Sequence, residues 1–135
     1  MIYPMFAMIF LTFLVGAQLF RLRLKAVKSG KVRLSSFRLN TNTDTPPDML
    51  QAMRNYSNLF EVPVLFYVAG TLAIATHIEA VSITLLAWLF VAARAVHSWI
   101  HLTYNNVIHR MQAFMAGNVC LILIWILLLL NYASR

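Results

Sequence analysis

Four long apolar segments dominate this chain and restrict its fold more than any other feature. They cover about residues 2–24, 49–78, 81–104 and 110–132. A helix needs about 20 residues to cross a hydrocarbon layer about 30 Å thick, and each segment is that long. None shows the alternation of polar and apolar residues that is typical of a barrel strand. Helices are therefore expected, because they satisfy the hydrogen bonds of the backbone within lipid. The sequence therefore predicts an all-α membrane protein, a four-transmembrane-helix antiparallel bundle forming a single domain over residues 1–135.

The composition agrees with this fold class. Of 135 residues, 61% are hydrophobic and 11% are charged, which is more apolar surface than a soluble core of this size can bury. No basic residue precedes the first segment and no small-residue cleavage pattern follows it, so we expect a retained span and not a signal peptide. Cys120, the one cysteine, lies in the last segment and is expected to be a packing residue.

Basic residues begin after residue 20, at the end of the first apolar segment, and indicate how the chain is oriented. They are Arg21, Arg23, Lys25, Lys28, Lys31, Arg33 and Arg38. By the positive-inside rule this first loop is cytoplasmic and the N-terminus lies outside, as expected for a multi-pass protein of an inner membrane. The formal net charge of +7 comes with almost no aromatic residues among these cations. We therefore expect membrane lipids as partners, and no nucleic acid.

A first group of polar residues opens the second segment. Arg54, Asn58 and Glu61 are spaced i, i+4 and i+7, so a continuous helix would place them on one stripe. Ionisable side chains at membrane depth are costly and commonly mark a functional site.

A second group occupies the cytoplasmic half of the third segment. Arg94, His97 and His101 are spaced i, i+3 and i+7, Tyr104 follows one turn later, and Arg110 begins the fourth segment. Both groups are therefore expected to meet at the same side of the membrane.

The charges of these groups do not balance. Three arginines oppose the single carboxylate of Glu61, which leaves an excess of about two positive charges. Buried cations need negative partners, so this excess would have to be neutralised. An anionic ligand with carboxylates for the arginines and an ammonium group for Glu61 or Asn58 would fit. Glutathione has this pattern, and the guanidinium of Arg110 near its sulfur would favour the thiolate.

These residues resemble a known family. The string RNYSNLFEVP at 54–63, the string ARAVH at 93–97, and Arg110 nine positions after His101 are similar to bacterial-type members of the MAPEG family. That name stands for membrane-associated proteins in eicosanoid and glutathione metabolism. The resemblance extends over nearly the whole chain, including the four helices and the long basic loop.

The resemblance implies a homotrimer that binds glutathione between subunits and receives a lipophilic small molecule from the bilayer. It implies a membrane-bound glutathione-dependent transferase or peroxidase acting on lipophilic electrophiles or lipid hydroperoxides. Arg110 would be catalytic and stabilise the thiolate. The residues expected to bind glutathione are Arg54, Asn58, Glu61, Arg94, His97, His101, Tyr104 and Arg21.

Two positions depart from the family pattern. His101 and Phe114 stand where family enzymes often carry tyrosine, so His101 or Tyr104 would have to replace the phenol. A non-catalytic lipid-binding or scaffold protein of the same fold is therefore the alternative.

Other functions are less compatible with the sequence. The polar residues could simply hold helices in register, and Arg110 could be a topology signal at a helix end. Zinc could use the i, i+4 spacing of His97 and His101, but no suitable further ligand lies close in sequence, and we predict no metal site. A small multidrug transporter normally needs an acid in its first span, and residues 2–20 contain none.

Overall fold

The computed structural model describes residues 1–32, 45–78 and 80–134, and within these residues it contains helices and no strand. The helices are α1 (Ile2–Lys28), α2 (Pro47–Asn58), α3 (Val62–Ala75), α4 (Val81–Leu102) and α5 (Val107–Ala133). α2 and α3 follow one another along the second of four membrane spans, so the prediction of an integral multi-pass protein is confirmed. Arg33 and Arg38 of the predicted basic loop lie outside the described residues.

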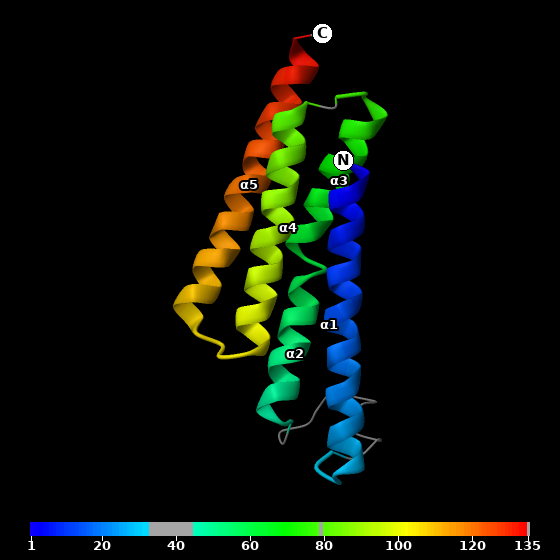
Figure 1. The fold of residues 1–135 in the computed structure, drawn as a ribbon, viewed down its shortest axis with the longest axis vertical. Helices are drawn as coiled ribbons and strands as arrows, with labels where there is room; N and C mark the ends of the chain where they lie inside the picture. Colours follow the sequence, from blue (N-terminus) through cyan, green and yellow to red (C-terminus); the bar gives the residue numbers. More distant parts are fainter. Residues whose placement is uncertain (33–44, 79, 135) are drawn as a thin grey trace.

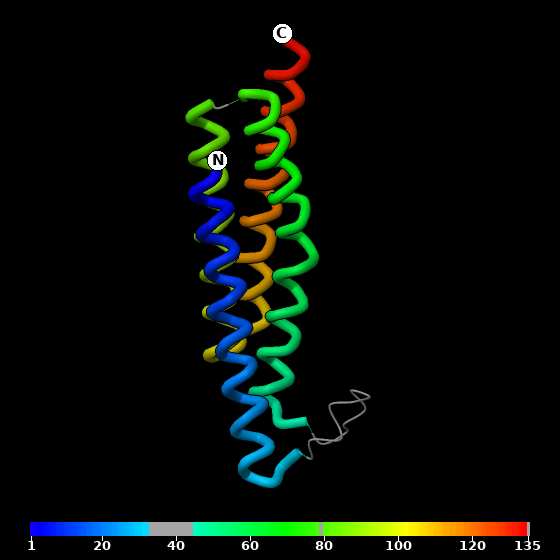
Figure 2. Tube along the Cα trace, turned by 90° about the vertical axis from the view of Figure 1, so that its right-hand side faces the viewer, coloured from blue at the N-terminus to red at the C-terminus, as the bar shows by residue number. Residues whose placement is uncertain are grey.

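The spans alternate in direction, as Figures 1 and 2 show. The end of α1, the start of α2 and the α4–α5 turn lie toward one end of the bundle, which we call the basic end because it carries Lys25, Lys28 and Lys31. Both termini and the α3–α4 turn lie toward the other end, which we call the terminal end. This is the predicted antiparallel arrangement. α1 and α2 extend beyond the α4–α5 turn at the basic end (Figure 1).

Local sequence signals explain where the helices begin and end. α1 ends at Lys28, and Gly30 just beyond it has a φ of 69°, a left-handed conformation that glycine adopts without steric cost. α2 starts with Pro47 in its first turn, where the missing N–H has no helical partner to lose. The Asn106 side chain caps α5 by accepting from the backbone N–H groups of Ile108 at 2.9 Å and His109 at 3.1 Å.

The second span is interrupted, and the prediction of one helix over 49–78 needs correction at this point. α2 ends at Asn58 and α3 begins at Val62, with a turn over residues 59–61. Pro63 explains the break, because it has no N–H to donate to the carbonyl of Leu59 and its ring crowds the preceding turn. Glu61 consequently has a ψ of −91°, outside the helical range. The break removes the single stripe predicted for Arg54, Asn58 and Glu61.

Two hydrophobic clusters hold the spans together. In the larger one Phe66 of α3 stacks on Phe90 of α4, with ring centroids 4.6 Å apart, and both side chains are fully buried. A smaller cluster joins α1 to α2 near the basic end, where Ala26 packs with Met49 and Ala52. The spans differ in length: α4 has 22 residues, whereas α1 and α5 have 27 each and α2–α3 covers 29.

We expect Phe66→Ala to lower the unfolding free energy by about 2–4 kcal/mol, because it leaves a cavity against Phe90 that the surrounding helices fill only in part. Thermal melting in detergent measures this loss. The control is Phe6→Ala on the outer face of α1, where the side chain is 67% exposed and little packing is lost. Equal melting temperatures for the two variants would contradict the central role of this stacked pair.

Candidate functional site

The break in the second span brings Arg94 of α4 onto the end of α2. Its Nη2 donates hydrogen bonds to the side-chain Oδ1 and, at 3.2 Å, to the backbone carbonyl of Asn58, the last residue of α2. The Nδ2 of Asn58 in turn donates to Oε2 of Glu61 at 3.4 Å. We call Arg94, Asn58 and Glu61 the Arg94 cluster. A cation at this position also complements the negative end of the α2 dipole.

The guanidinium of Arg94 is only partly satisfied. Its side chain is fully buried, and its Nε and Nη1 have no hydrogen-bond partner among the described residues. The ring of Phe114 lies 5.5 Å from the guanidinium carbon, which adds a cation–π contact on one side. Unpaired buried donors are costly, and two of them on one cation favour an additional acceptor.

A second group of polar side chains lies beside the α4–α5 turn. The side chain of Arg110 donates from Nη1 to Oδ1 of Asn105 at 2.7 Å and lies 3.5 Å from Nε2 of His101. The Nδ1 of His97 lies 3.0 Å from the backbone carbonyl of Arg110. We call Arg110, His97, His101 and Asn105 the Arg110 cluster.

The partners of the two histidines determine which ring nitrogen carries the proton. A carbonyl only accepts, so Nδ1 of His97 carries the proton and its Nε2 is left as an acceptor. Arg110 only donates, so Nε2 of His101 accepts and its Nδ1 carries the proton. That Nδ1 is buried and has no partner among the described residues. The Arg110 cluster therefore offers a hydrogen-bond donor beside a half-buried guanidinium.

The two clusters are continuous along α4. His97 follows Arg94 by one turn, and Phe114 contacts both, with its ring centroid 5.8 Å from that of His97. The structure thus brings together five of the predicted residues plus the predicted catalytic one: Arg94, Asn58, Glu61, His97, His101 and Arg110.

Three other predicted residues lie on the surface of the single chain. Arg54 is exposed on α2, one turn before Asn58, and Arg21 is exposed on α1. Tyr104 lies beyond Leu102, the last residue of α4, and its side chain is 59% exposed. Its hydroxyl lies 3.2 Å from Nδ1 of His109. The prediction that Tyr104 continues the α4 stripe is therefore incorrect, because the helix ends before it.

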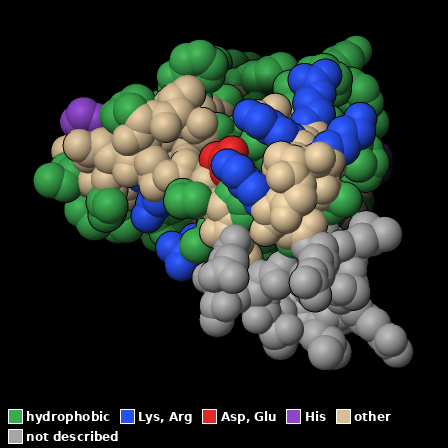
Figure 3. Space-filling view, turned by 90° about the horizontal axis from the view of Figure 1, so that it is seen from below, with side chains coloured by type: hydrophobic (Ala, Val, Ile, Leu, Met, Phe, Trp, Pro, Cys, Tyr) green, Lys and Arg blue, Asp and Glu red, His purple; other side chains and the backbone are tan. Residues whose placement is uncertain are grey.

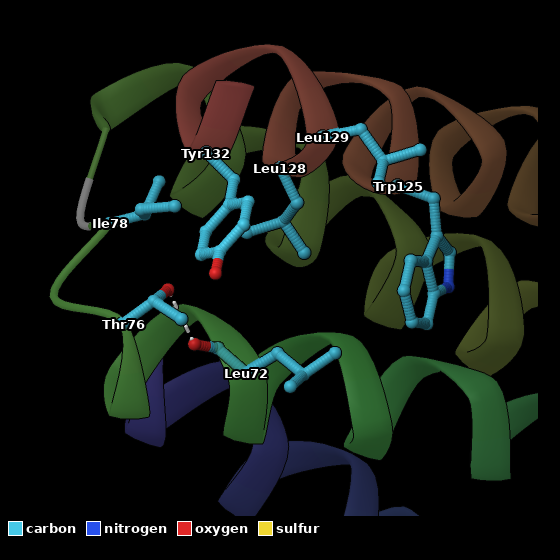
Figure 4. A pocket seen from close by; sticks show the side chains of 7 residues that line it. All are labelled: Leu72, Thr76, Ile78, Trp125, Leu128, Leu129 and Tyr132. Atoms are coloured by element: carbon cyan, nitrogen blue, oxygen red, sulfur yellow. Dashed lines mark hydrogen bonds between the residues drawn. The ribbon is translucent and has the colours of Figure 1, made fainter. Parts of the chain in front are cut away.

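A cavity of about 290 Å³ lies between α3 and α5 at the terminal end, away from both clusters (Figure 4). Its lining is almost entirely apolar, with Leu72, Ile78, Trp125, Leu128 and Leu129 as walls. In Figure 4 the hydroxyl of Tyr132 points toward Thr76 and Leu72. This lining suits a hydrocarbon and offers no charge to an anion.

Comparison with known protein families tests the predicted family membership. A sequence model of the MAPEG family matches residues 1–130 of the chain. The chain belongs to the MAPEG family. Comparisons with curated proteins and with solved structures gave no match. The predicted family membership is thereby confirmed, whereas the roles assigned to individual residues stay predictions.

Sequence reasoning missed a buried polar pair in this MAPEG protein. Ser98 of α4 donates to Oδ1 of Asn55 of α2 at 3.2 Å, and both side chains are almost fully buried. Asn55 and Asn58 are spaced i, i+3, and Arg94 and Ser98 are spaced i, i+4, so two polar contacts on consecutive turns could have been anticipated. The pair extends the polar contact between α2 and α4 by one turn toward the basic end.

We expect Asn58→Leu to lower the unfolding free energy by about 1–3 kcal/mol, because buried Arg94 loses an acceptor. Asn58→Asp keeps an acceptor and should retain most of the stability. Arg54→Leu changes an exposed residue one turn earlier and should stay within about 0.5 kcal/mol. Thermal melting of the three variants decides the matter, and equal losses for both Asn58 variants would show that the acceptor is unimportant.

Proposed function

We propose that this MAPEG protein binds glutathione at the Arg94 and Arg110 clusters and is a membrane-bound transferase or peroxidase acting on lipophilic electrophiles or lipid hydroperoxides. The observation that carries the proposal is the buried guanidinium of Arg94, which lies beside Asn58 and Glu61 and has two donors without a partner in the described part of the chain. Such donors call for an anionic acceptor. Family membership supports the same class of chemistry.

The residues of the two clusters, together with Arg54, suit the chemical groups of glutathione. Arginine forks bind carboxylates, so Arg94 and exposed Arg54 would hold the acidic ends of the tripeptide. Glu61 is exposed at the break between α2 and α3, and its carboxylate would accept a hydrogen bond from the ammonium group of glutathione. Glutathione, when bound, would supply a sulfur that displaces the leaving group from the carbon of an electrophile, or that breaks the O–O bond of a hydroperoxide to give an alcohol and a sulfenic acid, which a second glutathione reduces to the disulfide and water.

Arg110 is the residue proposed to act on the sulfur. Its guanidinium is half-buried, so its charge is less screened than at an open surface and favours the thiolate over the thiol. The Nε2 of His97, one turn before His101 on α4, can accept a hydrogen bond. The Nδ1 of His101 can donate a hydrogen bond, in place of the tyrosine common in the family. These roles use the tautomers that the partners of both rings require.

The remaining parts of the proposal concern assembly and orientation. We propose a homotrimer, in which exposed Arg54 and Arg21 would approach the clusters of a neighbouring subunit. The basic end would face the cytoplasm, since lysines and arginines are retained on that side of a membrane. The protein would then lie in an inner membrane with both termini outside.

A non-catalytic lipid-binding protein is the second candidate, favoured by two observations. The cavity between α3 and α5 is apolar and of a size for part of a lipid chain. Tyr104, the phenol expected to serve the site, contacts His109 instead. Such a protein would bind lipid and show no affinity for glutathione.

Titration calorimetry of the detergent-solubilised protein with glutathione distinguishes the two candidates. We expect Glu61→Gln and Arg54→Ala each to weaken glutathione binding by about tenfold, the value of one charge-assisted hydrogen bond. Lys28→Ala removes an exposed charge elsewhere and should leave the affinity unchanged. Absence of glutathione binding by the wild-type protein, with lipid binding retained, would favour the second candidate.

For catalysis we expect Arg110→Ala to lower turnover of glutathione with an aryl halide by about 10- to 1,000-fold, because the thiolate loses its nearby cation. The ultraviolet absorbance of bound thiolate should fall in parallel while glutathione still binds. Arg110→Lys keeps the charge and should recover part of the rate. Unchanged turnover in Arg110→Ala would remove this residue from the catalytic role.

A further inference from the structure

We propose that the groove between α1 and α4 holds one anionic phospholipid of the leaflet at the basic end. An acyl chain would lie in the groove, and the phosphate would reach a small polar cavity beside Lys25 and Lys31. The site shares no residue with the Arg94 and Arg110 clusters, so it is independent of the proposed function.

The apolar part of the site is a groove of about 280 Å³ between two helices. α1 contributes Leu11, Leu14 and Val15, and α4 contributes Ala95, Ser98, Trp99 and Leu102. Leu14 is 52% exposed and Trp99 is 68% exposed, so the groove opens along the side of the bundle. The hydroxyl of Ser98 in this lining already donates to Asn55, and the remaining side chains form a mostly apolar wall suited to methylene groups.

The polar part is a cavity of about 100 Å³ where α1 ends and α2 begins. It is lined by Leu22, Lys25, Ala26, Ser29, Lys31, Pro46 and Asp48. Oδ1 of Asp48 accepts from the backbone N–H of Met49 at 3.0 Å, so its carboxylate is partly engaged within the chain. Among the described residues that line the cavity, two ammonium groups against one carboxylate leave a net positive charge, and a phosphodiester would neutralise it.

The two parts lie on one stripe of α1. The groove uses residues 11, 14 and 15, the cavity uses residues 22, 25 and 29, and exposed Gln18 lies between them at helical spacing. A rise of 1.5 Å per residue separates Leu14 from Lys25 by about 16 Å. This distance fits within one leaflet, which is about 20 Å thick including its head groups. A single phospholipid can therefore reach both parts.

Charge favours an anionic head group over a zwitterionic one. Lys25 and Lys31 line the cavity itself, so their positive charge acts directly on a head group held there. Figure 3 views the molecule from the basic end and shows Lys and Arg side chains gathered on this face. The groove continues this surface into the hydrocarbon layer.

Native mass spectrometry of delipidated protein, titrated with phosphatidylglycerol or phosphatidylcholine, tests the head-group part. We expect one tight phosphatidylglycerol per chain, bound at least about fivefold more tightly than phosphatidylcholine, and Lys25→Ala and Lys31→Ala should each weaken it by about fivefold. Lys28→Ala is the matched control, because it removes the same charge without lining the cavity. An equal loss in Lys28→Ala would overturn the site in favour of diffuse attraction, and so would equal affinity for the two lipids.

A pair of alanines on α4 tests the groove. Ala95 and Ala92 are both exposed, and Ala95 lines the groove whereas Ala92 is absent from its lining. Ala95→Phe should fill the groove and weaken phosphatidylglycerol binding by at least about tenfold, and Ala92→Phe should leave it unchanged, with both melting temperatures near that of the wild type. Binding retained in a folded Ala95→Phe would contradict the proposed position of the acyl chain.

Discussion

A helix end inside a membrane span is the constraint on which the rest of this structure depends. Pro63 prevents the second span from continuing as one helix, and α2 therefore stops at Asn58. In hydrocarbon no water is present to satisfy the freed carbonyl groups. Backbone N–H groups of the turn over residues 59–61 bond to several carbonyls at the end of α2, and the guanidinium of Arg94 adds hydrogen bonds to both the backbone carbonyl and the side chain of Asn58. A cation is thereby held at a depth where it would otherwise be costly.

The position of Arg94 organises the half of the bundle nearer the basic end. Ser98 and Asn55 repeat the α2–α4 contact one turn further along, and His97 turns toward the start of α5. Arg110 is then joined to His101 and Asn105 across the α4–α5 turn. A single polar layer thus connects three spans. The larger hydrophobic cluster, centred on Phe66 and Phe90, connects the spans nearer the terminal end by apolar packing.

The sequence was sufficient for the membrane class, the four spans and the family, because each follows from long apolar runs and from residue strings that persist locally. The sequence was insufficient where contacts between helices determine helix ends and hydrogen-bond partners. Pro63 is visible in the sequence, but the spacing of Arg54, Asn58 and Glu61 predicts one stripe only if the helix continues through residues 59–61. Spacing alone predicts that Tyr104 continues the third helix. The structure ends α4 at Leu102, and the turn that follows includes both Tyr104 and Asn105, whose φ is 47°. The unpaired donors of Arg94 could be recognised only once its neighbours were in place.

The unequal span lengths have a consequence for how the protein sits in lipid. α4 has 22 residues and is about 33 Å long, close to the thickness of a typical hydrocarbon layer. The other three spans are longer and can tilt or project into the head groups, whereas the shortest one has little such freedom. Because α4 also carries Arg94, His97 and His101, a change in bilayer thickness would act first on the helix that holds the polar layer. The lipid composition of the host membrane is therefore coupled mechanically to the geometry of this layer.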